Sequence, residues 1–160
     1  MSKTGAAAVG SAAAAGAPAA LAVRAGVLRV STRGPHCYDV SSEVAGWLES
    51  IQAKAGLLTV FIRHTSASLL IQENADADVQ RDLLDWLRRM APAGAHYRHD
   101  SEGPDDMPAH IKAMVMPVSL SIPVANGAMR LGTWQGIYVV EHRDRPHTRE
   151  VEMQFIGTVG

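Results

Sequence analysis

The sequence has one cysteine, no surplus of positive charge and no long apolar run, and each absence excludes a class of protein. The single cysteine, Cys37, excludes an internal disulfide framework and a zinc site made of cysteines alone. It fits a reducing compartment, so we expect a cytoplasmic protein. Fifteen Lys and Arg residues balance sixteen Asp and Glu residues, which argues against a nucleic-acid partner. No apolar run approaches the ~18 residues of a membrane span.

Common catalytic signatures are also missing, so the residues alone do not name a reaction. The sequence contains no Gly-rich phosphate loop with Lys, no Rossmann fingerprint, no His-Glu-x-x-His and no Gly-x-Ser-x-Gly. Its 160 residues, 47% of them apolar, predict one domain with a real core, which we place at 23–160. Residues 1–22 are rich in Ala and Gly and predict a flexible leader, the alternative being an export or transit peptide.

Hydrophobic periodicity predicts an α+β fold. Apolar residues at helical spacing predict helices over Ser42–Ala55, Asp78–Met90 and Ala109–Met116. Short apolar and β-branched runs predict strands over 21–32, 57–64, 66–72, 118–124, 128–132, 135–141 and 149–156. Because strands follow one another more often than they alternate with helices, the order favours α+β over a doubly wound fold.

The most constrained polar segment is the loop from Glu102 to His110, which His99 precedes. It holds three carboxylates and one imidazole, and a glycine and two prolines prevent a continuous helix through it. Carboxylates this close repel one another unless a cation or a proton relieves them, and imidazoles nearby add metal ligands. The segment therefore predicts a divalent-metal site, with Mg or Zn as the candidates. The alternative is a solvated acidic loop.

Two further polar motifs follow predicted strands. His64 ends one strand and precedes small hydroxyl residues, including Ser66, which can bind an oxyanion through hydroxyls and backbone amides. The alternative is a Ser/Thr turn with a satisfied histidine. Glu73 and Asn74 directly follow the next strand and are candidate site residues.

The fourth motif combines a glycine-flanked pair, Trp134 and Gln135, with charged residues at the end of the same strand. The flanking glycines allow a ligand or a neighbouring backbone to approach closely. Along an extended strand Glu141 and Arg143 share one face and His142 lies on the other. If His142 faces the site, its charged neighbours make structural ion pairs. Alternatively, Arg143 clamps a phosphate with its planar fork.

These motifs occur in one order as four blocks: His64-Thr65-Ser66-Ala67-Ser68-Leu69, Glu73-Asn74-x-Asp76, Tyr97-x-His99-Asp100-x-Glu102-Gly103-x-Asp105-Asp106-Met107-Pro108-x-His110-Ile111-Lys112, and Gly132-Thr133-Trp134-Gln135-Gly136-Ile137 with Glu141-His142-Arg143. Together they resemble the YjbQ-like family of small bacterial and archaeal proteins, over about residues 24–157. Pro104 stands where the family more often has a small residue such as Ala. This change stiffens the loop without removing a ligand.

The resemblance implies a YjbQ-like α+β domain with β-sheets in a sandwich-like arrangement, two to three helices and a homotrimeric assembly around a threefold axis. It also implies a transferase of the secondary thiamine-phosphate synthase type, as a main or side activity. That reaction joins hydroxymethylpyrimidine diphosphate to thiazole phosphate and releases pyrophosphate. The implied partners are small phosphorylated metabolites and further copies of the chain, with no nucleic acid and no membrane.

Carried onto this sequence, the resemblance distributes roles among the matching polar residues. We hypothesise that His99, His110 and His142 converge on one metal or anion, because each lies next to a backbone break or a carboxylate that can fix its tautomer. The remaining roles are catalytic for His64, Glu102, Asp105, Asp106 and Arg143, and substrate- or anion-binding for Ser66, Asn74 and Gln135. Two other functions fit the same residues, a non-catalytic trimeric binder of a metal or small anionic metabolite and a metal-dependent hydrolase.

Overall fold

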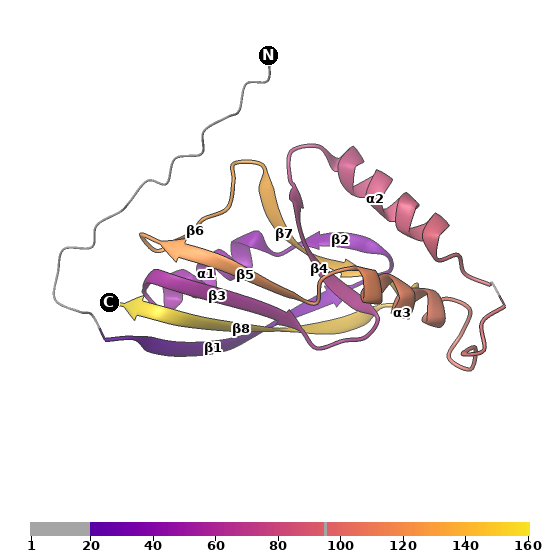
Figure 1. Cartoon of the computed structure of the whole chain (residues 1–160), viewed down its shortest axis with the longest axis horizontal. Helices are drawn as coiled ribbons and strands as arrows, with labels where there is room; N and C mark the ends of the chain where they lie inside the picture. The colour runs from indigo at the N-terminus through magenta and orange to yellow at the C-terminus, as the bar shows by residue number, and fades with distance from the viewer. Residues whose placement is uncertain (1–19, 95) are drawn as a thin grey trace, which may run out of the picture.

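The computed structural model describes residues 20–94 and 96–160, so the expected leader lies outside the described residues as far as residue 19. The element order is β1 (Ala22–Thr32), β2 (His36–Asp39), α1 (Ser41–Ser50), β3 (Ala53–Ile62), β4 (Ala67–Glu73), α2 (Ala77–Met90), α3 (Asp106–Val115), β5 (Ser119–Ala125), β6 (Ala128–Met129), β7 (Gln135–Glu141) and β8 (His147–Val159). The strands group together rather than alternating with helices, which confirms the α+β prediction (Figure 1). Within the described ranges, the helices are too short or too polar to cross a membrane.

Two antiparallel sheets form the body of the protein. The five-stranded sheet has the order β1-β8-β3-β5-β6, and the three-stranded sheet has the order β2-β7-β4. In the larger sheet β8 lies between β1 and β3, and Gly157 faces Gly56 across the β3–β8 pair. A Cβ at Gly56 would lie 2.3 Å from the carbonyl oxygen of Ile156, so this close backbone approach requires glycine.

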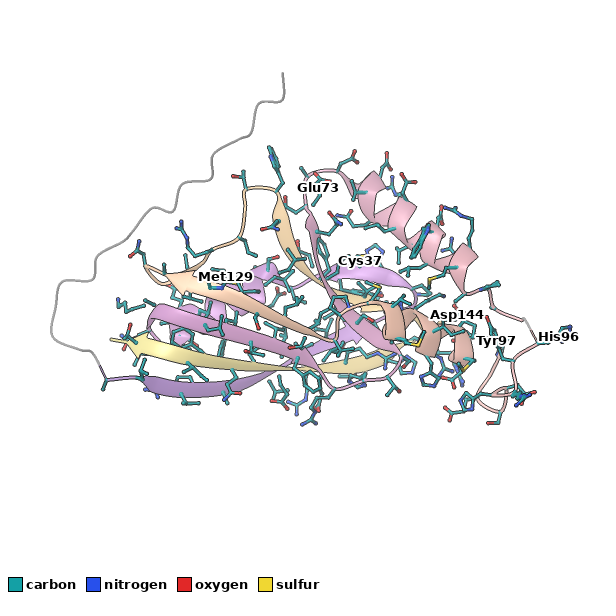
Figure 2. The ribbon with its side chains drawn as sticks, viewed as in Figure 1. Cys37, Glu73, His96, Tyr97, Met129 and Asp144 are labelled. Atoms are coloured by element: carbon teal, nitrogen blue, oxygen red, sulfur yellow. The ribbon has the colours of Figure 1, made fainter. Side chains whose placement is uncertain are left out.

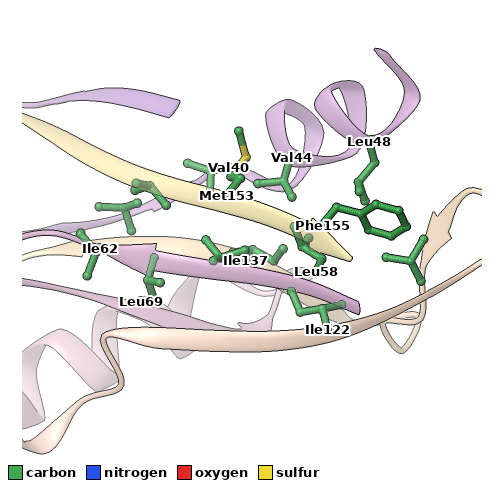
Figure 3. Packing of buried hydrophobic residues seen from close by; sticks show 14 of the residues in the cluster. Val40, Val44, Leu48, Leu58, Ile62, Leu69, Ile122, Ile137, Met153 and Phe155 are labelled. Carbon is green, nitrogen blue, oxygen red and sulfur yellow. The ribbon is translucent and has the colours of Figure 1, made fainter. Parts of the chain in front are cut away.

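The main core lies between the two sheets. Alternate residues of the larger sheet, such as Leu58, Ile122 and Phe155, pack against Leu69 and Ile137 of the smaller sheet (Figure 3). α1 covers one end of this core with Val44 and Leu48, both almost fully buried. The two sheets thus form the expected sandwich-like arrangement.

A second, smaller core lies on the other face of the three-stranded sheet. It contains Cys37 from β2, Tyr138 and Val140 from β7, and Leu87 from α2. Burial raises the pKa of the Cys37 thiol to about 11, so this thiol is protonated and behaves as a small apolar group. The smaller sheet is therefore buried on both faces, which explains the continuous apolar run of β7.

Strand alternation places charged residues inside the sandwich. On β7, Glu141 follows Ile137 and Val139 on the face toward the larger sheet. On β8, Arg149 precedes Val151 and Met153 on the face toward β7. The two strands therefore present Glu141 and Arg149 to each other at one end of the core.

Several elements have other bounds than expected: the last helix begins at Asp106 rather than Ala109, and the last strand extends over His147–Val159 rather than 149–156. Two differences have a clear local cause. The first helix ends at Ser50 rather than Ala55, because Gln52 adopts a φ of 54° and Ala53 begins β3 by pairing with Val159. The strand His36–Asp39 was not expected, because four residues are too few to display an alternating pattern. It is fixed by pairing with β7 instead.

Candidate functional site

Helix α3 and the loop before it bring together His99, Asp106 and His110. Asp106 begins α3 and His110 lies one turn later, so both side chains project from one face of the helix. The preceding loop returns His99 to the same place, with its Nε2 2.8 Å from Asp106 Oδ2. One donor atom from each of the three residues lies within 4.8 Å of the others. Two imidazoles and one carboxylate are ligands that suit zinc and other divalent transition metals.

The two oxygens of the Asp106 carboxylate have different partners. Its Oδ1 accepts a hydrogen bond from Arg143 Nη1, while Oδ2 faces both imidazoles. The Asp106 side chain is only 2% exposed, whereas those of His99 and His110 are 45% and 32% exposed. The three-residue group therefore has a buried anchor and a face accessible to solvent, the arrangement of a site that keeps open positions for a substrate.

In the neutral form of its ring, His110 aims a lone pair at this carboxylate. Its Nδ1 lies 2.9 Å from the carbonyl oxygen of Thr65, and because a carbonyl only accepts, Nδ1 carries the proton. In the neutral ring Nε2 is then an acceptor, 3.4 Å from Asp106 Oδ2. Two acceptors at this distance repel each other unless a proton or a cation lies between them. The donor set therefore fits a divalent metal.

Asp105 and Arg143 form a buried ion pair behind this group. Arg143 Nε donates to Asp105 Oδ2 at 2.9 Å, and the backbone N–H of Asp144 donates to the same oxygen at 2.9 Å. Burial on its own raises the pKa of Asp105, but these hydrogen bonds and the charge of Arg143 outweigh it, so the pKa lies below its ordinary value. Both side chains are thus committed to positioning Asp106 rather than free to bind a substrate.

Glu102 contributes its backbone instead of its carboxylate. Its carbonyl oxygen accepts from Arg143 Nη2 at 2.9 Å, and the residue is exposed on the loop. Of the two alternatives for Arg143, the structure shows structural ion pairs, with Asp105 and Asp106. The phosphate-clamp role would require Arg143 to leave these partners.

His142 does not belong to the three-residue group and lines a cavity between the three-stranded sheet and the helices. It is 2% exposed, and its Nε2 lies 2.8 Å from Ser68 Oγ on β4. The cavity, of about 280 Å³, is lined in part by Leu84, Leu87 and Lys112. Burial first, and then the charge of Lys112, lower the pKa of His142 to about 4, so the ring is neutral at physiological pH. The structure brings together His99 and His110 as expected, but Asp106, not His142, completes the group.

A second cluster lies on the opposite face of β7, around Glu141. Both carboxylate oxygens bind Arg149, at 2.7 Å to Nε and 2.5 Å to Nη2, and Thr32 Oγ1 donates to Oε2 at 2.6 Å. Glu141 Oε1 also accepts from the backbone N–H groups of His142 and Arg143, both at 2.9 Å. Burial alone raises the pKa of Glu141, but these donors lower it below its ordinary value. Glu141 is therefore an ionised, fully satisfied carboxylate in the core.

His64 lies beside this second cluster, half-buried at the end of β3. Its Nε2 accepts from the backbone N–H of Glu150 at 2.8 Å, and its Nδ1 lies 3.5 Å from Arg149 Nη1. Burial and the positive charge of Arg149 lower its pKa. The next two residues connect the Glu141 cluster with the three-residue group. The backbone carbonyl of Thr65 accepts from His110, and that of Ser66 accepts from Arg149.

Sequence reasoning missed Arg149 and the pairing role of Ser68. Arg149 lies on the same face of β8 as Val151, Met153 and Phe155, which are all buried. A charged residue on the apolar phase of a strand signals a buried ion pair, and this signal is visible in the sequence. The sequence does not show which residue pairs with Arg149, because Glu141 lies on a strand of the other sheet.

Asn74 and Gln135 lie at the opposite end of β4 and β7. The register pairs Glu73 with Gln135 at one end and Ala67 with Glu141 at the other, about 20 Å away for six residue steps. Figure 2 shows Glu73 far from Asp144, which follows the Glu141 end of β7. Gln135 Oε1 accepts from the backbone N–H of Gly132 at 2.8 Å, and Asn74 Nδ2 donates to the Gln135 carbonyl at 3.5 Å. Within one chain the structure does not bring these residues to the three-residue group.

Comparison with known proteins identifies relatives over most of the chain. The family model described as UPF0047 protein YjbQ-like matches residues 27–158. A UPF0047 protein of Synechocystis is 47% identical over 134 residues, which cover 83% of this chain and 91% of that protein. The UPF0047 protein YjbQ of Escherichia coli O157:H7 is 40% identical over 125 residues, which cover 78% of this chain and 89% of that protein.

Solved structures share the fold. A hypothetical protein from Aeropyrum pernix K1 superposes with a TM-score of 0.78 and 30% identity, over 84% of this chain and 98% of that chain. An uncharacterised YjbQ/UPF0047 protein from Clostridium acetobutylicum gives 0.72 and 36%, over 80% of this chain and 98% of that chain. A protein from Sulfolobus solfataricus P2, described as of unknown function, gives 0.80 at 22% identity over 86% of this chain and 99% of that chain, which shows the fold alone.

Proposed function

Because the chain belongs to the UPF0047 protein YjbQ-like family, we propose that it is a divalent-metal-dependent enzyme acting on small phosphorylated metabolites through the metal site His99–Asp106–His110. The observation that carries the proposal is the convergence of two imidazoles and one carboxylate, with one donor atom from each lying within 4.8 Å of the others. A divalent metal between His110 Nε2 and Asp106 Oδ2 would bind both atoms, and His99 would supply a third ligand from the loop.

The reaction that we propose is transfer of the thiamine-phosphate synthase type, between hydroxymethylpyrimidine diphosphate and thiazole phosphate. When bound, a divalent cation neutralises the charge of the departing pyrophosphate. The residues of the chain hold the site in place: Arg143 fixes one oxygen of Asp106, and the Thr65 carbonyl fixes the tautomer of His110. The exposed imidazoles leave room for the substrate beside them.

We also propose that the protein is a homotrimer assembled through the outer face of the five-stranded sheet. Val23, Ile156 and Leu57 form a row across β1, β8 and β3 and are 58%, 47% and 45% exposed. Val27 and Phe61 lie further along the same face, on either side of Glu152. An exposed apolar row of this kind is typical of an interface between copies. Light scattering on the full chain at micromolar concentration tests the proposal, with a monomeric mass as the contrary result.

Metal binding and turnover are tested separately. Calorimetry with Zn²⁺, Mn²⁺ and Mg²⁺ is expected to show one site per chain, and His99→Ala and His110→Ala are each expected to weaken it by at least ~10-fold. His142→Ala and the exposed control His36→Ala are expected to leave the affinity unchanged. Wild-type affinity in both His99→Ala and His110→Ala would overturn the metal site.

The metal-bound protein is then assayed with both thiamine precursors. Formation of thiamine phosphate that depends on the metal supports the transferase. Metal binding without any product indicates a non-catalytic binder, and release of phosphate from simple esters indicates a hydrolase. Either of these results contradicts the proposed reaction while leaving the metal site in place.

A further inference from the structure

One end of Arg149, its Nη1, faces a histidine nitrogen rather than a carboxylate. Its Nε and Nη2 donate to Glu141, and Nη2 also donates to the Ser66 carbonyl at 3.3 Å. Among the described residues, the polar partner recorded for Nη1 is His64 Nδ1, at 3.5 Å. The Arg149 side chain is 4% exposed, so the N–H groups of Nη1 depend on partners at the site rather than on bulk solvent.

The tautomer of His64 makes this contact a meeting of two donors. The backbone N–H of Glu150 donates to His64 Nε2 at 2.8 Å, so Nε2 carries a lone pair. The proton of the neutral ring must then be on Nδ1, which faces Arg149 Nη1. Protonation of the whole ring would break the bond from Glu150 without supplying an acceptor to Arg149. Neither the neutral nor the protonated ring can therefore accept from both Glu150 and Arg149.

An oxyanion resolves this mismatch. One oxygen can accept from His64 Nδ1–H and Arg149 Nη1–H together, because two donors 3.5 Å apart leave room for an acceptor about 2.8 Å from each. We propose that His64 and Arg149 form an anion subsite that binds the phosphoryl group of the substrate. The subsite deepens the proposed function, and its place beside the metal site rests on that function.

The surroundings of His64 indicate what the phosphoryl group is attached to. His64 and His110 line one surface groove of about 460 Å³, whose other walls include Phe61, Met114 and Val118. The groove therefore connects His64 of the anion subsite with His110 of the metal site along an apolar wall. Such a wall suits a flat, weakly polar ring, so the ligand class is a phosphate ester of a small ring rather than free phosphate.

The tautomer is tested first, on the wild-type protein freed of metal with a chelator. Long-range ¹H–¹⁵N spectra are expected to show His64 with Nδ1 protonated and Nε2 unprotonated. Addition of phenyl phosphate is expected to shift the His64 Nδ1 and Arg149 guanidinium signals together. A His64 ring protonated at Nε2, or signals that do not move at saturating ligand, overturns the subsite.

Affinities then separate this subsite from the metal site. In metal-free protein, His64→Ala is expected to weaken phenyl phosphate binding about tenfold or more, the loss of one hydrogen bond to a charged group. His64→Gln, whose amide can accept from Glu150 and donate to the anion, is expected to restore part of the affinity. His36→Ala serves as the matched exposed control and is expected to bind like the wild type.

The two proposals fail in different ways. His99→Ala is expected to lose metal binding while it keeps phenyl phosphate binding, and His64→Ala is expected to do the reverse. Equal affinity of inorganic phosphate and phenyl phosphate contradicts the role of the apolar wall. Unchanged phenyl phosphate affinity in His64→Ala contradicts the subsite whatever the metal measurements show, and absent metal binding in the wild type contradicts only the metal site.

Discussion

The two ends of strand β7 carry polar side chains in opposite environments. At one end Glu141, His142 and Arg143 are at most 6% exposed, and each side chain contacts a partner from a distant element. At the other end Gln135 is exposed and bonds to the backbone of its own turn. A buried charge persists only with a partner, so its position is fixed by the whole fold, whereas an exposed amide is fixed only by its neighbours.

This difference separates residues that build a site from residues that close a turn. Arg143 holds Asp106 toward the two imidazoles, and Glu141 holds Arg149 beside His64. Both buried pairs therefore place a functional candidate indirectly. Gln135 positions Gly132 and no candidate ligand. The comparison predicts large effects of mutation at the Glu141 end and small ones at the Gln135 end.

The largest effect is expected from Arg149→Met. The substitution leaves Glu141 charged and buried without its partner, which should lower the free energy of unfolding by about 3–5 kcal/mol. Urea denaturation measures the loss. The matched control is Arg29→Met, because Arg29 pairs with Glu150 at the surface with its side chain 67% exposed, and such pairs contribute about 0–1 kcal/mol. Similar losses in the two variants would remove the distinction between buried and exposed pairs.

A smaller effect is expected from the acid titration of His142. Its pKa in the folded protein is about 4, below the ordinary value of 6.5, so between these pH values the unfolded chain binds a proton that the folded chain does not. The stabilising contribution is complete above about pH 6.5 and is lost as the pH falls to about 4, for a total of roughly 3 kcal/mol.

Unfolding free energies of wild type and His142→Gln between pH 4 and 7.5 check this expectation. The variant should depend less steeply on pH, and the difference between the two curves should grow in this window. His64 has a lowered pKa as well, so the difference between the proteins, not either curve alone, reports on His142. His36→Gln is the exposed control, and a slope for His142→Gln equal to that of wild type would contradict the burial argument.

The sequence predicted those features that depend on neighbouring residues. Strand 135–141 has the expected bounds, because its apolar run is bordered by glycine on one side and charge on the other. His99, Asp106 and His110 lie within one loop and the turn that follows, so the sequence placed His99 and His110 together although it began the helix at Ala109 rather than Asp106. The strand His36–Asp39 depends on pairing with β7, and no local pattern shows it.

The features that escaped prediction depend on which strands face each other. His142 was placed with the other histidines, but strand alternation turns it toward Ser68 and the helices. Arg149 carries a visible signal of burial, yet its partners Glu141 and His64 come from β7 and the end of β3. Sheet order and register, rather than residue type, decide these contacts, and one sequence does not specify them.

The smallest effect is expected from Asn74→Ala at the Gln135 end. Its recorded contact is a 3.5 Å hydrogen bond to the Gln135 carbonyl, and the side chain is exposed, so the free energy of unfolding should change by less than about 1 kcal/mol. Metal affinity and phenyl phosphate affinity should equal those of wild type, because about 20 Å separates this turn from the Glu141 end of β7.

Assembly offers a direct way to break this last expectation. In a trimer, the Gln135 end of one copy can lie near the metal site of another, and Asn74→Ala would then reduce affinity without reducing stability. Gln135→Ala provides the comparison, since it also removes the bond to Gly132 and should lower stability slightly more. If either variant loses ligand affinity while its free energy of unfolding stays unchanged, the two ends of β7 contribute to one site built from two chains. The difference in burial between the two ends would then no longer separate site residues from turn residues.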